Sequence, residues 1–149
     1  LAVPLRSYTQ PLVIMLAIPF GFVGAVLGHL LLEIPLSLES YVALFAVGGV
    51  AINDSLILVA KINDMLRKNT SIYKAVVLAG KARFRAIFLT TATTVMGLLP
   101  LINEQSSDAE KLMPMVITLA FGIFFSSLVT LLLVPTACVV LKKYPIRSL

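Results

Sequence analysis

The sequence predicts an all-α fold: an integral membrane helical bundle of four transmembrane helices, with an additional amphipathic helix on the cytoplasmic surface. The first observation behind this prediction is composition. In this chain 59% of the residues are hydrophobic and 13% are charged, whereas soluble domains carry about 25% charged residues. The second is four charge-poor runs, each long enough, at about 18 residues or more, to cross a hydrocarbon core about 30 Å thick. The third is that the basic residues gather on one side of these runs.

Small residues characterise the first span, predicted at about 11–32. Gly24 and Gly28 form a Gly-x-x-x-Gly pattern, and Gly21 begins a second pair of small residues at the same spacing. Small residues let helix backbones approach closely in lipid, so we assign these three glycines to helix packing. The connection that follows, 33–39, is short, and the first two spans should therefore form an antiparallel hairpin.

The second span, at about 40–64, combines two glycines with two polar residues. We assign Gly48 and Gly49 to helix packing as well. Asn53 and Asp54 follow them in an otherwise apolar run. Asp54 lies about ten residues from each end of its helix, roughly 15 Å of rise, which places it near the middle of the membrane.

A short amphipathic helix is expected at about 71–81, lying on the membrane surface. Its apolar residues recur at helical spacing and share one face: Ile72, Ala75, Val76 and Ala79. Gly80 should end it before the third span, at about 84–102, which stops near Pro100.

The fourth span, at about 112–142, is longer than a membrane requires and should bend at Pro135. We interpret Ser126 and Ser127, within this span, as packing residues or as partners in hydrogen bonds between helices.

The charges predict the orientation of the bundle. With four spans, every Lys and Arg except Lys111 lies on one side, and five acids lie on the other: Glu33, Glu39, Glu104, Asp108 and Glu110. Cytoplasmic loops are rich in Lys and Arg, so both termini and the 61–85 segment are expected in the cytoplasm. This topology accounts for the net charge of +5, and no nucleic-acid partner is expected.

No basic region with a cleavage site precedes the first span, and the chain begins with Leu. We therefore expect a piece of a longer polypeptide without a signal peptide.

Asp54 is the strongest candidate for function. An Asp at the centre of a membrane helix costs about 2.5 to 3.5 kcal/mol on insertion scales. Burial disfavours the charged form of a carboxyl group, and a carboxyl group near neutrality can take up and release protons. The alternative is a protonated or hydrogen-bonded Asp54 that holds helices together, with Asn53 and Ser55 as its partners.

The third span supplies a second set of candidates. Arg83 and Thr90 are seven residues apart and therefore within about 20° of each other on the helix. Hydroxyl groups recur through the segment 90–94, where they could hand on protons, and Arg83 could be a fixed cation at the cytoplasmic mouth. The alternative is that the threonines only bond carbonyl groups of their own helix. Arg83 would then be present only because cytoplasmic segments are rich in Lys and Arg.

Other chemistry finds little support. Cys138 is the single cysteine and His29 the single histidine, so neither a disulfide nor a metal cluster is expected, and we interpret His29 as an interfacial or packing residue. An intramembrane aspartyl protease needs two membrane aspartates, and a serine protease needs a Ser and a His that can meet. We therefore predict no enzyme and no cofactor.

Several short motifs, in order, resemble the last third of the permease subunits of resistance-nodulation-division (RND) efflux pumps. The segment 18–25, IPFGFVGA, resembles a Pro-hydrophobic-Gly-x-x-Gly-Ala element of the family. The segments 49–59 and 83–91 resemble its relay-bearing helix and its Arg-x-Arg-Pro-Ile-x-x-Thr-Ser stretch. The segment 97–101, GLLPL, and the Val134-Pro135 pair also match.

The resemblance implies the final four of twelve helices of a proton-driven antiporter in the bacterial inner membrane. It implies a homotrimer joined to a periplasmic adaptor and an outer-membrane channel, with the substrate chosen by periplasmic domains outside this chain. Arg83, Thr90, Asn53 and Asp54 fall on relay positions, with H⁺ as the coupling ion. Well-known drug pumps carry Lys-Asn where this chain has Asn53-Asp54, and Pro where it has Ala86. The missing Lys implies that the charge that balances Asp54 comes from helices that this chain does not contain. The rival interpretation is a non-catalytic membrane scaffold, or a truncated relic that only packs helices.

Overall fold

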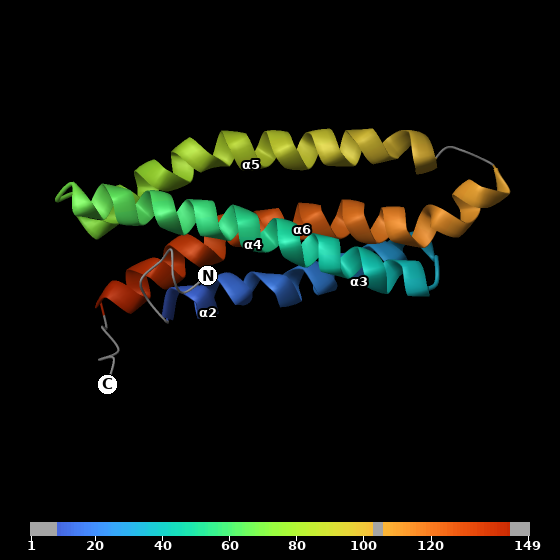
Figure 1. Cartoon of the computed structure of the whole chain (residues 1–149), viewed down its shortest axis with the longest axis horizontal. Helices are drawn as coiled ribbons and strands as arrows, with labels where there is room; N and C mark the ends of the chain where they lie inside the picture. Colours follow the sequence, from blue (N-terminus) through green and yellow to red (C-terminus); the bar gives the residue numbers. More distant parts are fainter. Residues whose placement is uncertain (1–8, 103–105, 144–149) are drawn as a thin grey trace.

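The computed structural model describes residues 9–102 and 106–143, and its helices run side by side along one long axis (Figure 1). The described residues form five helices and no strand: α2 (Thr9–Met15), α3 (Ala17–Leu32), α4 (Leu38–Arg67), α5 (Ile72–Ile102) and α6 (Ser107–Lys143). Four stretches are long and apolar enough to cross a membrane: Gln10–Leu32, Leu38–Arg67, Ile72–Ile102 and Ser107–Leu141. The chain is therefore an all-α membrane bundle, as the sequence predicts.

The first span is divided into α2 and α3 at Leu16. Pro19 explains the division, because it has no N–H to donate to the carbonyl group of Met15 and its ring crowds that carbonyl. Leu16 keeps right-handed helical angles, φ −62° and ψ −20°, and its N–H donates to the carbonyl of Leu12 at 3.1 Å. The two helices therefore continue each other through one membrane span.

The hairpin between α3 and α4 has defined helix ends. Glu33 closes α3 in the left-handed conformation, with φ 54°, and its N–H donates to the carbonyl of His29. Ser37 begins α4 with a capping box, in which the side chains of Ser37 and Ser40 each accept from the other's backbone N–H. The Glu33 cap satisfies a carbonyl group at the end of α3, and the capping box satisfies N–H groups at the start of α4.

The predicted break at Gly80 is wrong. The structure joins the expected surface helix at 71–81 and the expected third span at 84–102 into one helix, α5. Gly80 has no positive φ angle and lies between Ala79 and Lys81, which favour helix. One Gly in a helix interior costs only about 1 kcal/mol relative to Ala, which continuous helical bonding on both sides offsets.

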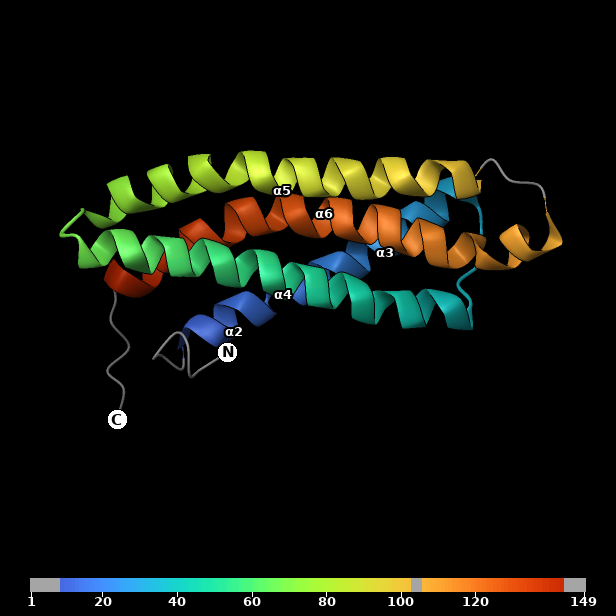
Figure 2. The same ribbon diagram turned by 45° about the horizontal axis from the view of Figure 1, so that its top comes forward.

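The fourth span, α6, is the central helix of the bundle. It packs against α3, α4 and α5, and Figure 2 shows it between α5 on one side and α3 and α4 on the other. It begins at Ser107, before the predicted start at 112, and it includes Pro114 and Pro135 without ending at either.

Three glycines of α3 let it approach its neighbours closely. A Cβ atom on Gly28 would lie 2.5 Å from Cγ of Phe121, and one on Gly24 would collide with Phe125. A Cβ atom on Gly21 would lie 2.7 Å from Cγ1 of Val47. Gly48 and Gly49, on α4, differ from these three. The nearest such neighbour of Gly48 is Ile18, at 3.7 Å, and no atom lies within 4 Å of a Cβ on Gly49.

The two ends of the bundle carry opposite charges. Figure 1 shows the start of α2, the end of α6 and the α4–α5 connection at one end. We call it the basic end because seven cations lie in the last part of α4, the α4–α5 connection and the first part of α5: Lys61, Arg67, Lys68, Lys74, Lys81, Arg83 and Arg85. At the other end, the acidic end, lie Glu33, Glu39, Asp108 and Glu110. The main buried cluster lies in the basic half: Val13, Ile14, Leu58, Val59, Ile62, Ala79 and Val134.

Candidate ion-coupling site

Asp54 occupies a buried position near the middle of α4, where 8% of the residue is exposed. No residue that the structure describes donates a hydrogen bond to its carboxylate. The neighbouring Ser55 is fully buried and bonds Thr130 of α6 instead. The interpretation of Asp54 as a group held by Ser55 and Asn53 therefore finds no support in the contacts of α4.

Arg83, on α5, is the cation associated with Asp54. Its positive charge acts on the carboxylate across the α4–α5 interface, although the two side chains are not in ion-pair contact. The Nε atom of Arg83 is buried and has no hydrogen-bond partner among the residues described. Because buried polar groups are nearly always hydrogen-bonded, the unpartnered guanidinium nitrogen on α5 and the unpartnered carboxylate on α4 make these two residues candidates for a functional site.

A pocket of about 460 Å³ opens between α4 and α5 on the basic side of this pair. Its lining consists of Ile57, Ala60, Lys61, Asp64, Ala82 and Arg83. Asp64 is paired with Lys68, at 3.2 Å from its Nζ atom. The pocket thus joins Arg83 and Lys61 to the basic end, and it begins one turn of α4 from Asp54.

Lys61 lines this pocket together with Arg83 but is not among the candidates drawn from the sequence, although its spacing offers a signal. Asp54 and Lys61 are seven residues apart on α4 and lie within about 20° of each other. The same spacing linked Arg83 to Thr90 on the next helix.

Asn53 and Thr90 are not brought to Asp54. Asn53 is exposed, since it lies about 100° from Asp54 around α4. Thr90 is exposed on α5, and its hydroxyl donates to the carbonyl of Ala86 in its own helix at 2.9 Å. The threonine that faces the bundle is Thr91, which is buried and donates to Oγ of Ser127 at 3.0 Å. Ser127 therefore forms a hydrogen bond between helices, as predicted.

His29 joins three helices at the acidic end. Its Nδ1 lies 2.9 Å from the carbonyl oxygen of Ile34, which can only accept, so Nδ1 donates this hydrogen bond. Its Nε2 lies 2.9 Å from the hydroxyl oxygen of Thr118 and 3.3 Å from that of Ser40. His29 is therefore a hydrogen-bonded packing residue, in agreement with the sequence interpretation.

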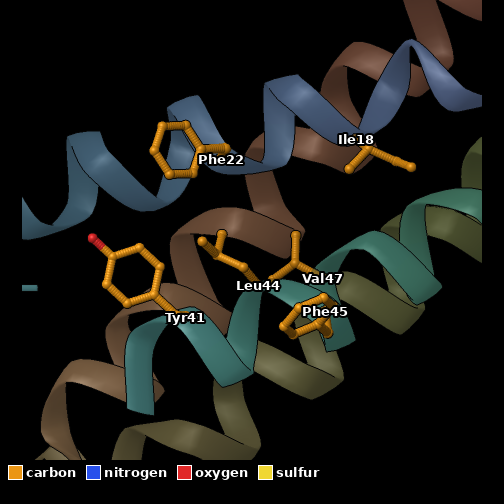
Figure 3. A pocket seen from close by; sticks show the side chains of 6 residues that line it. All are labelled: Ile18, Phe22, Tyr41, Leu44, Phe45 and Val47. Carbon is orange, nitrogen blue, oxygen red and sulfur yellow. The ribbon is translucent and has the colours of Figure 1, made fainter. Parts of the chain in front are cut away.

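A second pocket, of about 330 Å³, lies between α3 and α4. Figure 3 shows its six side chains: Ile18, Phe22, Tyr41, Leu44, Phe45 and Val47. The Tyr41 hydroxyl is the single polar group among these side chains, so this pocket cannot bind an ion through them.

Comparisons with known proteins match nearly the whole chain. The model of the AcrB/AcrD/AcrF family matches residues 1–142. The multidrug resistance protein MdtC of Pantoea ananatis (strain AJ13355) is 32% identical over 143 residues. The proteins of the same name from Yersinia pseudotuberculosis (serotype O:1b, strain IP 31758) and Yersinia pestis (bv. Antiqua, strain Angola) are each 33% identical over 131 residues. The alignments cover 93% and 87% of this chain, but only 14% and 13% of those relatives.

Proposed function

Because the chain belongs to the AcrB/AcrD/AcrF family of RND permeases, we propose that it supplies part of the ion-coupling path of a multidrug efflux permease. The observation that carries this proposal is the buried Asp54 on α4 with Arg83 across the α4–α5 interface: the carboxylate of Asp54 and the buried Nε atom of the half-buried Arg83 both lack a hydrogen-bond partner among the described residues. Ionisable groups inside membrane segments are expensive and usually functional. Packing alone does not explain why such a pair is present.

In the proposed cycle, Asp54 accepts a proton in one state of the permease and releases it in another, with H⁺ as the coupling ion. Arg83 supplies the counter-charge when Asp54 is ionised. The pocket lined by Lys61 and Arg83 gives water a route between this pair and the basic end. By the excess of Lys and Arg, the basic end faces the cytoplasm of a bacterial inner membrane, so protons would leave on that side.

Asn53 and Thr90 are exposed, and their positions indicate where other helices of the permease would contribute to the relay. Both lie on outward faces of α4 and α5, where helices from the remainder of the protein would meet them and complete the relay. We also propose, from the family resemblance, that the complete permease is a homotrimer which works with a periplasmic adaptor and an outer-membrane channel.

The test is substitution of Asp54 in the complete gene product that contains this chain. Asp54→Asn keeps the size of the side chain but cannot titrate, and we expect it to abolish drug export driven by an imposed pH gradient in proteoliposomes. Asp54→Glu should retain part of the activity.

Asp108→Asn serves as the control, since Asp108 lies at the acidic end with its side chain 91% exposed. Export by Asp54→Asn at the normal rate, with normal dependence on pH, would refute the coupling role and favour a membrane scaffold. Export that follows a sodium gradient instead would refute H⁺ as the ion.

A further inference from the structure

Two hydroxyl pairs join the helices of the proposed coupling site to α6. Ser55 of α4 lies 3.4 Å from Thr130, oxygen to oxygen, and Thr91 of α5 donates to Ser127 at 3.0 Å. All four side chains are buried, the most exposed being Thr91 at 7%. Ser127 and Thr130 are three residues apart, so they lie on neighbouring turns of one side of α6.

Each pair has one member on the helix that carries a proposed coupling residue. Ser55 follows Asp54 directly in α4, and Thr91 lies about two turns of α5 beyond Arg83. Helices α4 and α5 each contact α6 more extensively than they contact each other. The separation and relative rotation of Asp54 and Arg83 are therefore set largely through α6.

Hydroxyl groups suit this purpose because apolar packing in lipid gives helices little rotational preference. A hydrogen bond between side chains requires one rotation and one vertical offset of the two helices. In the hydrocarbon region water does not compete for these groups. A slip of α4 or α5 against α6 by one residue would turn Ser55 or Thr91 away by about 100° and leave both hydroxyls of the pair without a partner.

We propose that Ser127 and Thr130 are positioning residues of the coupling site, which hold α4 and α5 so that Arg83 faces Asp54. This inference rests on the proposed function, because it assigns to α6 a role in the same proton-coupling step. The proposal gives a role to two residues of α6, a helix that carries none of the relay positions implied by the family resemblance.

The test compares hydroxyl deletions in the complete gene product, with drug export measured as a function of pH and normalised to the amount of protein in the membrane. Ser127→Ala and Thr130→Val should each lower export several-fold per molecule and shift the pH at which export is half-maximal. Thr130→Ser, which keeps the hydroxyl group, should keep the pH profile of the unsubstituted protein. The double variant Ser55→Ala/Thr130→Val should be no worse than its more impaired single variant, because the two hydroxyls act as one pair.

Thr136→Val is the matched control on α6. Thr136 is exposed, and its hydroxyl donates to the carbonyl group of Leu132 in its own helix, at 2.7 Å. The inference fails if Ser127→Ala and Thr130→Val have the pH profile of this control, or if they reduce only the amount of protein. Asp54→Asn separates the two proposals: if it abolishes export while the hydroxyl variants match the control, the coupling role stands and the positioning role falls.

Discussion

At the scale of single residues, Asp54 and Arg83 are notable for contacts that they do not make. Buried hydroxyls on the same helices find partners, as Ser55 and Thr91 do. The carboxylate and the guanidinium Nε find none within the described chain. A carboxylate that accepted several hydrogen bonds would be fixed in its charged form. A relay needs a group that can change its charge without breaking such a set of bonds.

Removal of the Arg83 charge should therefore disable the pair. We expect Arg83→Ala to lower proton-driven export by at least about tenfold, which corresponds to about 1.4 kcal/mol, because ionised Asp54 then loses the positive charge that acts on it across the α4–α5 interface. Arg83→Lys should retain part of the activity, since it keeps the charge but loses the planar guanidinium.

Arg85→Ala is the matched control for this measurement in proteoliposomes, because Arg85 is exposed on the same helix two residues away. Equal export by Arg83→Ala and Arg85→Ala would mean that Arg83 only follows the charge rule for cytoplasmic loops.

At the scale of helices, close approach depends on which glycines face a neighbour. A Cβ atom added to the α3 glycines would meet Val47, Phe121 or Phe125, whereas one added to Gly49 would have no atom of a neighbouring helix within 4 Å. The sequence contains both kinds, and their spacing alone does not distinguish them.

The same substitution at two positions tests this difference. Gly24→Ala should destabilise the bundle by about 1 to 3 kcal/mol through overpacking against Phe125. Gly49→Ala should be neutral or stabilising by up to about 1 kcal/mol, because Ala favours helix more than Gly does. Thermal unfolding of the two purified variants in one detergent gives the comparison, and equal melting temperatures would contradict the α3–α6 packing described above.

Hydropathy and caps predict helices well but do not fix their rotation. All four spans follow from apolar length, and the hairpin follows from a short connection. The break at Gly80 was a wrong prediction because a single Gly lowers helix propensity without preventing a helix. Asp54 is a candidate from the sequence because it stands alone in an apolar run, and the structure buries it near the middle of α4. The choice between Thr90 and Thr91 could not be made, because neighbouring positions differ by about 100° and only the packing on α6 determines which one is buried.

At the scale of the whole molecule, the bundle is incompletely covered. α5 is the least buried of the four spans, and large apolar side chains such as Phe84, Phe88 and Met96 are more than half exposed along it. The curated relatives are about seven times as long as the matched region. The outward face of α5 is thus where we expect further helices of the permease.

The opposite charges of the two ends predict a definite orientation in the membrane. In a Cys138→Ala background, Asp108→Cys should react with a membrane-impermeant maleimide added to spheroplasts, because the acidic end faces outward. Ser71→Cys, in the exposed α4–α5 connection, should react only after the membrane is permeabilised. Labelling of Ser71→Cys in intact spheroplasts would reverse the proposed direction of proton release.

The hydrogen bonds of His29 have a mechanical consequence for the bundle. They connect the α3–α4 hairpin to Thr118 of α6 at the acidic end, and the α3 glycines bring the same helices into close contact further along. α3, α4 and α6 should therefore move as one rigid body. α5 is attached through fewer buried side chains, with Thr91 as its described hydrogen-bonded link to α6. A conformational change that alters the distance between Asp54 and Arg83 would then be a displacement of α5 against this body. Such a displacement would require the Thr91–Ser127 hydrogen bond to break.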